Sequence, residues 1–374
     1  METSGLRSAA YWESDAVGVR LNPKRDLDAM GLIPFLCDQC GIRHSIVMAT
    51  SGSSGEPKFA VLSKGAILAS AAAVNEHCGI TSEDVWLAGL SDFHVGGLGI
   101  HARAFLSGSE VVRMSGSRWD RTGEILVNDI LEAKATLTSL TPTHLFDLVR
   151  HDVKAPDSLR GVLLGGGRMD PEIISRAKDL DWPVWPSYGM TEACSQIATS
   201  LDGECEWLSI LSHWETRVTE NERLAIRGAA LFSGYAQRSK GKWMYHEATG
   251  SDGWYETGDL CEVKEGKLRF RSRADDLIKI SGELISLSSL DSTAMEIARS
   301  LGVEAAMVSR PDPRRENELV LIVEGVEELA ESVRTKFNER VGGLESVKRA
   351  IAVQSLPRTE IGKVNRAELN AIVS

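Results

Sequence analysis

The pattern that most constrains the fold is an alternation of short apolar runs with segments of helical length between residues 45 and 200. The apolar runs are SIVMA, DVWLAGL, EVVRM, ATLTSL and GVLLGG. The segments between them include KGAILASAAAVNEH, GEILVNDILEA and PEIISRAKDL, which carry apolar residues at helical spacing. Strands that alternate with helices predict a layered α/β domain, in which the helices cover a sheet.

The rest of the chain has two different patterns. Residues 204–273 contain short strands separated by turns, which predicts an antiparallel, barrel-like β subdomain. A charged segment, RSRADDLIKISGE, then leads into a unit with a helix, an apolar strand pair and another helix. Because 374 residues exceed what one core usually supports, we expect two domains. We place a large domain at 1–272, a joint at 273–275 and a small α+β domain at 276–374.

Composition excludes several classes of function. The net charge of −11 argues against a nucleic-acid partner, because such partners require a basic surface. The chain has no run of 18 apolar residues, and its first residues lack the apolar middle of a signal peptide, so we expect no membrane insertion and a cytoplasmic location. Cys37 and Cys40 form a C-x-x-C that could be half a zinc site or a redox pair. No second pair completes it, so we expect free thiols.

The segment ATSGSSGEPKF, residues 49–59, has the composition of an anion cradle. Its glycines allow tight backbone turns, its hydroxyls and backbone N–H groups are donors, and its lysine is a cation. A phosphate is therefore the expected ligand. The alternative is an ordinary Ser/Gly turn that binds nothing. A P-loop kinase is excluded, because no Gly-Lys-Ser/Thr ends the segment.

A second polar segment, PSYGMTEACSQ, follows an apolar run at residues 186–196. Tyr188 offers a flat face for a base, and Gly189 lets a ligand approach the backbone. Thr191 could donate to a phosphate, and Glu192 could hold Mg²⁺. In the alternative interpretation, Glu192 is a carboxylate near a helix N-terminus, because TEACSQIA has helical character.

Two later segments carry single residues with a possible role. In GWYETGDL, Asp259 could accept hydrogen bonds from both hydroxyls of a ribose, or it could cap a turn. In LPRTEIGKVNR, Lys363 lies on a glycine-containing loop, where a lysine is usually solvated.

Together these segments resemble the adenylate-forming superfamily of acyl-CoA ligases, luciferases and peptide-synthetase adenylation domains. The family's signatures occur in the family's order: T-S-G-[ST]-[ST]-G-x-P-K, Y-G-x-T-E, T-G-D, R-x-D-D-x-I-K and a terminal G-K. The segments GMTEACSQIA, LLGGG and FHVGGLGIHAR are most similar to the o-succinylbenzoate–CoA ligases of menaquinone biosynthesis.

The resemblance implies an AMP-forming ligase with two half-reactions. A carboxylic acid and ATP form an acyl-adenylate and pyrophosphate, and the thiol of coenzyme A then forms the thioester and releases AMP. It implies ATP, Mg²⁺ and coenzyme A as cofactors, and a small C-terminal domain that rotates about the joint, with Asp275 at the hinge. Relatives are often dimers, so a homodimer is an expectation.

The resemblance also implies roles for individual residues. The catalytic residues that it implies are Lys363, which bridges the carboxylate and the phosphate, together with Thr191, Glu192 and His94; Glu192 also holds the metal. The residues implied at the nucleotide are Thr50, Ser51, Gly52, Ser53, Ser54, Gly55, Lys58, Gly165, Gly166, Gly167, Ser187, Tyr188, Gly189, Met190, Asp259, Arg273 and Lys279. The residues implied at the acid are His94, Arg103 and Gly166.

Each of these roles has a plainer alternative. Residues 163–167, LLGGG, could be a simple exit from a strand. His94 could be an ordinary core histidine. Arg103 lies nine residues after His94 on a predicted helix and would hold the second carboxylate of o-succinylbenzoate, or it could pair with a carboxylate of the protein.

The chain departs from the family pattern at three places. The first signature begins at residue 50, where relatives carry a longer N-terminal stretch, so the acid pocket would be more open or covered by a partner subunit. Pro186 replaces the usual adenine partner, which leaves adenine to backbone groups. Ser281 replaces a glycine where the thiol approaches. Two rivals therefore stay open: an adenylating enzyme for another acid or a carrier-protein thiol, and a non-catalytic ATP or acyl-AMP binding protein.

Overall fold

The computed structural model describes residues 3–23, 29–50, 58–115, 119–358 and 364–373. The chain divides into two compact units. The large unit comprises Met1–Thr219, Ala225–Thr257 and Glu262–Arg269, and the small unit comprises Glu220–Leu224, Gly258–Cys261 and Phe270–Ser374.

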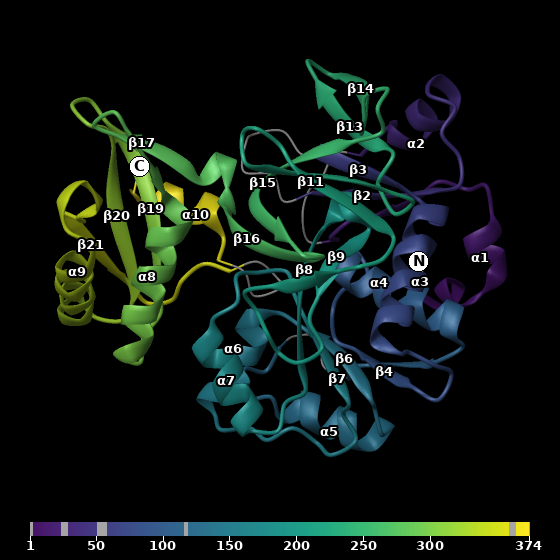
Figure 1. Ribbon diagram of the computed structural model, residues 1–374, viewed down its shortest axis with the longest axis horizontal. Helices are drawn as coiled ribbons and strands as arrows, with labels where there is room; N and C mark the ends of the chain where they lie inside the picture. The colour runs from purple at the N-terminus through teal and green to yellow at the C-terminus, as the bar shows by residue number, and fades with distance from the viewer. Residues whose placement is uncertain (1–2, 24–28, 51–57, 116–118, 359–363, 374) are drawn as a thin grey trace. The chain divides into compact units, whose positions relative to one another are not determined.

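The longest sheet has eleven strands in the order β11-β12-β15-β16-β10-β9-β8-β7-β6-β4-β5 (Figure 1). Five neighbouring strands at one end pair in parallel, as buried βα units do. They are β4 (Val85–Ala88), β5 (Glu110–Arg113), β6 (Leu137–Leu140), β7 (Gly161–Leu164) and β8 (Val184–Met190). Strands β4 to β7 coincide with or lie inside predicted apolar runs, whereas β8 extends into the segment described above as polar. The α/β prediction is confirmed.

Helices cover both faces of the parallel strands, because side chains alternate between the faces along each strand. Leu87 and Val162 pack against three helices on one face, seen together in Figure 1: α5 (Glu124–Ala133), α6 (Pro142–Arg150) and α7 (Pro171–Asp179). Trp86 points to the opposite face and lies against α4 (Val95–Ser107), which packs on α3 (Lys64–Cys78). The cores on both faces are buried.

A second sheet of five strands has the order β1-β2-β3-β13-β14. Its strands are β1 (Gly18–Arg20), β2 (Ser45–Ala49), β3 (Lys58–Ser63), β13 (Gly234–Ser239) and β14 (Lys242–Glu247). β1 pairs in parallel with β2, and the other pairs are antiparallel. Four short helical elements belong to the N-terminal part of the chain: η1 (Thr3–Arg7), α1 (Ala9–Glu13), α2 (Leu32–Pro34) and η2 (Phe35–Gln39).

The antiparallel strands predicted at residues 204–273 are distributed over both sheets. Five of them extend the eleven-stranded sheet: β10 (Leu208–Ile210), β11 (Trp214–Val218), β12 (Arg223–Gly228), β15 (Tyr255–Lys264) and β16 (Lys267–Arg273). A further strand of this sheet, β9 (Ser195–Thr199), lies before the predicted region. The β13–β14 hairpin instead joins the five-stranded sheet through pairing of β13 with β3. This crossover brings residue 235 beside the end of the β2–β3 hairpin.

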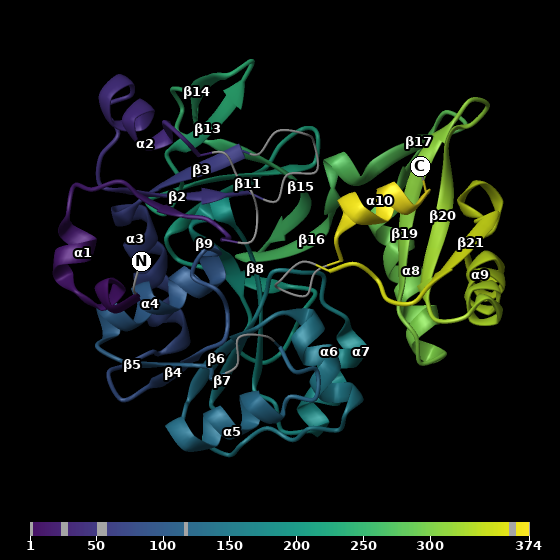
Figure 2. The same ribbon diagram turned by 180° about the vertical axis from the view of Figure 1, so that it is seen from behind.

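The small unit has the α+β organisation expected from its sequence. After η4 (Ala274–Asp276) it forms the hairpin β17 (Leu277–Ile280)–β18 (Glu283–Ser286) and α8 (Leu287–Ser300). A three-stranded sheet follows with β19 (Ala305–Asp312), β20 (Glu316–Glu324) and β21 (Arg349–Val353), together with α9 (Glu327–Val341), η5 (Gly343–Glu345) and α10 (Arg366–Val373). Helices α8 and α9 pack on one face of this sheet and α10 on the other (Figure 2).

All six cysteines, Cys37 and Cys40 among them, are free thiols. Among the described residues, no helix is long and apolar enough to cross a membrane.

Candidate active site

The β2–β3 hairpin carries the predicted anion cradle. The strand SIVMA is buried, as predicted, and Ala49 pairs with Phe59 on the partner strand. The backbone N–H of Thr50 donates to the carbonyl of Lys58 at 2.9 Å, which closes the hairpin around the segment between them. That segment, residues 51–57, lies outside the described residues, and with it the predictions for Ser51, Gly52, Ser53, Ser54 and Gly55.

Glu192 lies in a single 3₁₀ turn, η3 (Thr191–Ala193), between β8 and β9. The helical character expected of TEACSQIA is therefore wrong, because Ser195–Thr199 continues as strand β9 and pairs antiparallel with β8. Gly189 permits this tight return, since a Cβ there would lie 1.8 Å from the carbonyl oxygen of Ser195. Cys194 closes the turn with φ of 54°, in the left-handed region.

A tyrosine of β13 holds the Glu192 carboxylate. The hydroxyl of Tyr235 donates to Oε1 of Glu192. The hydroxyl oxygen of Tyr255 lies 3.3 Å from the hydroxyl oxygen of Tyr235. Burial, followed by the negative charge of Glu192, raises the pKa of Tyr235, so this tyrosine remains a proton donor. The backbone N–H of Phe232 also donates to the carbonyl of Glu192 at 2.8 Å, which fixes the turn.

Two predicted motifs meet at this tyrosine. The ammonium group of Lys58 lies 5.8 Å from the centre of the Tyr235 ring, while the hydroxyl of the same ring binds Glu192. Lys58, at the end of the anion cradle, and Glu192, the proposed metal ligand, therefore contact the same side chain of the large unit, Tyr235. Sequence reasoning missed Tyr235 and Tyr255, because their role depends on the crossover that places β13 beside β3.

The residues predicted to back the base follow the carboxyl ends of parallel strands, where α/β sheets bind ligands. Gly165, Gly166 and Gly167 follow β7, and Ser187 lies on β8. The Ser187 hydroxyl donates to the carbonyl of Leu164 at 2.9 Å, and a Cβ at Gly165 would lie 2.8 Å from that hydroxyl oxygen. Gly166 has φ of 83°, which favours glycine. Tyr188 and Met190 are half-buried on the same strand.

The loop at residues 89–94, here called the acid-side loop, joins β4 to α4 and is half-buried. His94 is the N-cap of α4; its backbone N–H donates to the carbonyl of Ser91 at 3.1 Å, and its ring lies 4.8 Å from that of Phe93. Gly97 allows the first turn of α4 to touch the loop, because a Cβ there would lie 2.2 Å from the carbonyl oxygen of Ser91.

Arg103 is 1% exposed on α4, with its guanidinium carbon 4.9 Å from the centre of the Trp86 ring. Burial lowers the pKa of Arg103 to about 10, and the largest opposing effect comes from the thiol of Cys78. No carboxylate within the described ranges forms an ion pair with Arg103, and its Nε has no hydrogen-bond partner there. Nε1 of Trp86 is likewise buried without a partner among these residues. The alternative in which Arg103 pairs with a carboxylate of the protein finds no partner in this part of the chain.

The remaining predicted residues lie in the small unit. Nε of Arg273 donates to Oδ1 of Asp259 at 3.1 Å; the Asp259 side chain is 6% exposed and that of Arg273 is 61% exposed. Lys279 is exposed on β17, and its carbonyl accepts from Asn317. The backbone of Asp275 lies in η4. Lys363 lies outside the described residues.

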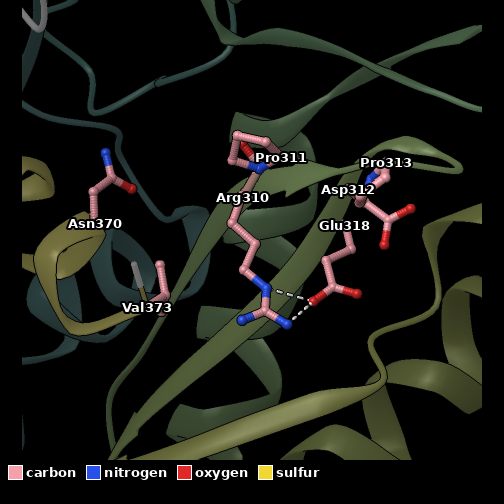
Figure 3. Close-up of a pocket in the computed structure, with 8 residues that line it drawn as sticks. Arg310, Pro311, Asp312, Pro313, Glu318, Asn370 and Val373 are labelled. Carbon is pink, nitrogen blue, oxygen red and sulfur yellow. Dashed lines mark hydrogen bonds and ion pairs between the residues drawn. The ribbon is translucent and has the colours of Figure 1, made fainter.

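One cleft of the small unit lies between the β19–β20 hairpin and α10 (Figure 3). Arg310 is the one cation among its eight lining residues, and Figure 3 shows it directed at Glu318, with which it forms an ion pair. Such a lining lacks the surplus of cationic groups and donors that a nucleotide phosphate requires.

Metal binding at Glu192 would need few protein ligands. In the part of the chain that the structure describes, no group of three or more His, Cys, Asp or Glu side chains could hold a metal ion. Mg²⁺ is commonly held by one or two carboxylates together with water and the phosphates of a nucleotide. Glu192 is therefore compatible with a magnesium ion that arrives with its nucleotide.

Comparison with known proteins assigns this arrangement to a family. Residues 44–235, about half of the chain, match the family of AMP-binding enzymes. The 2-succinylbenzoate–CoA ligase of Enterococcus faecalis is 29% identical over 85% of this chain and 67% of its own length. The enzyme of the same name from Listeria monocytogenes is 29% identical over 87% of this chain and 70% of its own length.

Solved structures give the same result. The chain is similar to the o-succinylbenzoate CoA synthetase of Bacillus subtilis in complex with its acyl-adenylate intermediate, with a TM-score of 0.73, 26% identity, and coverage of 87% of this chain and 68% of that one. The Bacillus subtilis enzyme with ATP and magnesium gives a TM-score of 0.71 and 26% identity over 87% of this chain and 69% of that one. The family match includes the cradle hairpin, the acid-side loop, Arg103 and Glu192.

Proposed function

Because the chain belongs to the family of AMP-binding enzymes, we propose that it is an ATP-dependent acid–CoA ligase that converts o-succinylbenzoate into o-succinylbenzoyl-CoA. ATP, Mg²⁺ and coenzyme A are its cofactors, and we place the reaction in the cytoplasm as a step of menaquinone biosynthesis. The relatives that carry the name 2-succinylbenzoate–CoA ligase support this choice of acid, since two of them align with at least 85% of the chain.

The observation that carries the proposal is the meeting of Lys58 and Glu192 at Tyr235. In the first half-reaction the acid's carboxylate attacks the α-phosphate of ATP, so two anions must approach each other. The site must therefore supply positive charge and hydrogen-bond donors at the phosphates. Lys58 supplies a cation and Thr191 a hydroxyl donor, while Glu192 would hold Mg²⁺, which neutralises phosphate charge when bound.

Tyr235 keeps the Glu192 carboxylate in place by a hydrogen bond from a side chain that stays protonated. A carboxylate that is oriented before the nucleotide arrives needs little reorganisation during the reaction, which is the main source of electrostatic catalysis. The residues of the cradle, 51–55, would add donors to the same phosphates.

The acid would lie at the carboxyl ends of β4, β6 and β7, between His94, Gly166 and Arg103. O-succinylbenzoate has two carboxylates, and only the succinyl one is activated. The other must be bound as a buried anion, which requires a cation or several donors. We assign this role to Arg103, which is buried on α4 with its guanidinium over Trp86 and which no protein carboxylate neutralises within the described residues.

We further propose that the second half-reaction uses a different orientation of residues 276–374. Lys363 would bridge the acid and the phosphate during adenylation and would leave when this domain rotates about residues 273–275. Asp259 and Arg273 would hold the ribose, and Lys279 would lie on the first hairpin of the moving domain. The large domain would then be residues 1–272.

A different thiol acceptor is the second candidate function, because the chain departs from the family pattern at Ser281. Ser281 has φ of 54° in the two-residue turn of the β17–β18 hairpin, a conformation in which glycine or asparagine is usual. In the family this turn borders the approach of the thiol, so the departure at Ser281 concerns the thiol acceptor. A carrier-protein thiol is the alternative acceptor.

The test is pyrophosphate release across a panel of aromatic, dicarboxylic and fatty acids, with and without coenzyme A. We expect release with o-succinylbenzoate, and thioester only when coenzyme A is present. Release with another acid alone would replace the substrate, and adenylation without thioester would favour the carrier thiol. No release with any acid would leave a binding protein of the same fold.

A further inference from the structure

The N-terminal segment at residues 3–20 precedes the part of the chain that matches the family, so the family match does not account for it. The segment is nevertheless firmly attached to the large unit. Leu6 and Trp12 are fully or almost fully buried, at 0% and 1% exposure, and the Trp12 ring stacks on Phe105 of α4 at 6.0 Å.

A buried lysine fastens the same segment to α3. Nζ of Lys64, the first residue of α3, donates to the carbonyls of Tyr11 at 2.8 Å and Ser14 at 2.7 Å and to the Ser14 hydroxyl at 2.7 Å. Lys64 is 1% exposed, so these three oxygens replace its hydration. The path of the chain before β1 is thus fixed.

This fixed path delivers Arg20 to the site. Arg20 is the last residue of β1 and pairs with Met48 of β2, two residues before Thr50. Its side chain leaves the sheet and reaches the acid-side loop, where Nη1 of Arg20 lies 2.8 Å from Oδ2 of Asp92. The side chains are 10% and 22% exposed, so the pair is largely shielded from water.

Asp92 is two residues before His94, and both lie in the acid-side loop. A shielded ion pair holds its partners in one geometry more strongly than an exposed pair does. Arg20 therefore connects β1, which pairs with the strand that leads into the anion cradle, with the loop that carries His94.

We propose that Arg20 is a positioning residue that holds the acid-side loop in its acid-binding conformation through Asp92. The inference rests on the proposed function only for the choice of acid. The apparent affinity for the acid is proportional to the fraction of molecules in which the loop has its acid-binding conformation. A variant that lowers this fraction therefore lowers the apparent affinity for the acid by the same factor. The nucleotide is bound by other residues, so its affinity should change little.

The test compares Arg20→Gln and Asp92→Asn with a control, Arg160→Gln. Arg160 forms a similar ion pair with Asp84 at 2.6 Å, but this pair lies at the amino ends of the parallel strands, away from the acid-side loop. Melting temperatures establish that all three variants fold. KM for the acid, KM for ATP and amide hydrogen exchange at residues 89–98 are then measured.

We expect Arg20→Gln to raise the acid KM on the order of tenfold, with ATP KM changed less than about twofold. Exchange at residues 89–94 should rise in both loop variants and not in Arg160→Gln. Arg20→Lys should restore part of the acid KM, and the double variant Arg20→Gln/Asp92→Asn should be no worse than Arg20→Gln, because both act through one contact.

Unchanged exchange at the loop, or an equal rise in both KM values, would overturn the inference. If the wild type does not release pyrophosphate with o-succinylbenzoate, the proposed acid is wrong. The kinetic comparison is then made with whichever acid is active, and if none is active the exchange comparison decides the inference alone. The two failures are therefore distinguishable.

Discussion

Arg103 lies in an apolar and aromatic environment with its guanidinium over the Trp86 ring. Within the described residues no carboxylate pairs with this buried cation, which is costly to the fold, and an anionic ligand would offset that cost. We expect Arg103→Leu to raise KM for o-succinylbenzoate by a factor on the order of 10², because one partner of a buried charge pair is removed. KM for ATP should change little. Steady-state pyrophosphate release at varied acid and ATP gives both values.

A monocarboxylic analogue without the ring carboxylate is the control for this prediction. It has no second anion to pair with Arg103, so its KM should rise far less in the Arg103→Leu enzyme. Equal losses with both acids would mean that Arg103 only shapes the pocket.

His144 makes a second prediction at the scale of one residue, this time for stability. Its ring stacks on Trp119 at 4.2 Å, and burial lowers the pKa of His144 to about 4. Between pH 6.5 and 4 the unfolded chain therefore binds a proton at His144 that the folded protein does not bind. The free energy of unfolding should fall as the pH falls through this range, by about 1.4 kcal/mol per pH unit at most for this residue.

The variant His144→Gln should remove this contribution. His144 is the third residue of α6 and takes part in a capping box with Thr141, a position that glutamine also fills. Urea unfolding at pH 7.5 and 5.0 should show a smaller loss of stability on acidification than in the wild type. His246 is exposed on β14, and His246→Gln should leave the wild-type loss unchanged. An unchanged loss in His144→Gln would contradict the assigned cause.

Among the helices and strands, those that depend on local patterns could be predicted. Helices α3, α5 and α7 and strands β4 to β7 can be predicted, because burial gives their sequences a recognisable apolar pattern. The sequence predicts helical character for TEACSQIA because its residues favour helix locally, whereas Gly189 and pairing with β8 impose a strand on Ser195–Thr199. The Glu192–Tyr235 contact could not be predicted, because it depends on the order of strands in a sheet.

Two adjacent glycines at the start of α4, Gly96 and Gly97, give a prediction about stability and its matched control. A Cβ at Gly97 would lie 2.2 Å from the backbone oxygen of Ser91, whereas one at Gly96 would lie 3.3 Å from the flexible end of Leu90. Gly97→Ala must therefore move the acid-side loop, at a cost of about 1–3 kcal/mol. Gly96→Ala should be neutral or stabilising, by up to about 1 kcal/mol, because alanine favours helix.

Thermal unfolding of the two variants measures these differences in stability. KM for the acid reports whether the acid-side loop has moved. Gly97→Ala should raise acid KM more than ATP KM. Equal stability of the two alanine variants would show that the contact between α4 and the loop is not tight in solution.

For the molecule as a whole, the sequence predicts the order of elements in the small unit but not where its functional residues meet those of the large unit. That meeting depends on the orientation of one unit to the other, which local patterns do not contain. The motifs near residues 275 and 363 therefore acquire their roles only through the proposed rotation.

The hinge gives a prediction about this rotation. Asp275→Pro restricts φ to a narrow range within η4, so the chain there can adopt fewer conformations. We expect thioester formation to slow more than adenylation, measured as coenzyme A consumption from supplied acyl-adenylate and as pyrophosphate release. Asp275→Ala is the control for loss of the side chain alone. Unchanged overall turnover in the proline variant would remove Asp275 from the hinge.

Substitution of Lys363 should affect the two half-reactions most differently. If it bridges the acid and the α-phosphate only during adenylation, Lys363→Ala should slow acyl-adenylate formation by a factor on the order of 10²–10³, the usual loss when one stabilising donor is removed. Thioester formation from supplied acyl-adenylate should stay near the wild-type rate, because the lysine has then left the site. Lys348→Ala, in the same domain and outside every proposed site, is the control for loss of one positive charge. An equal slowing of both half-reactions by Lys363→Ala would mean that one arrangement of the chain serves both, and the rotation would be wrong.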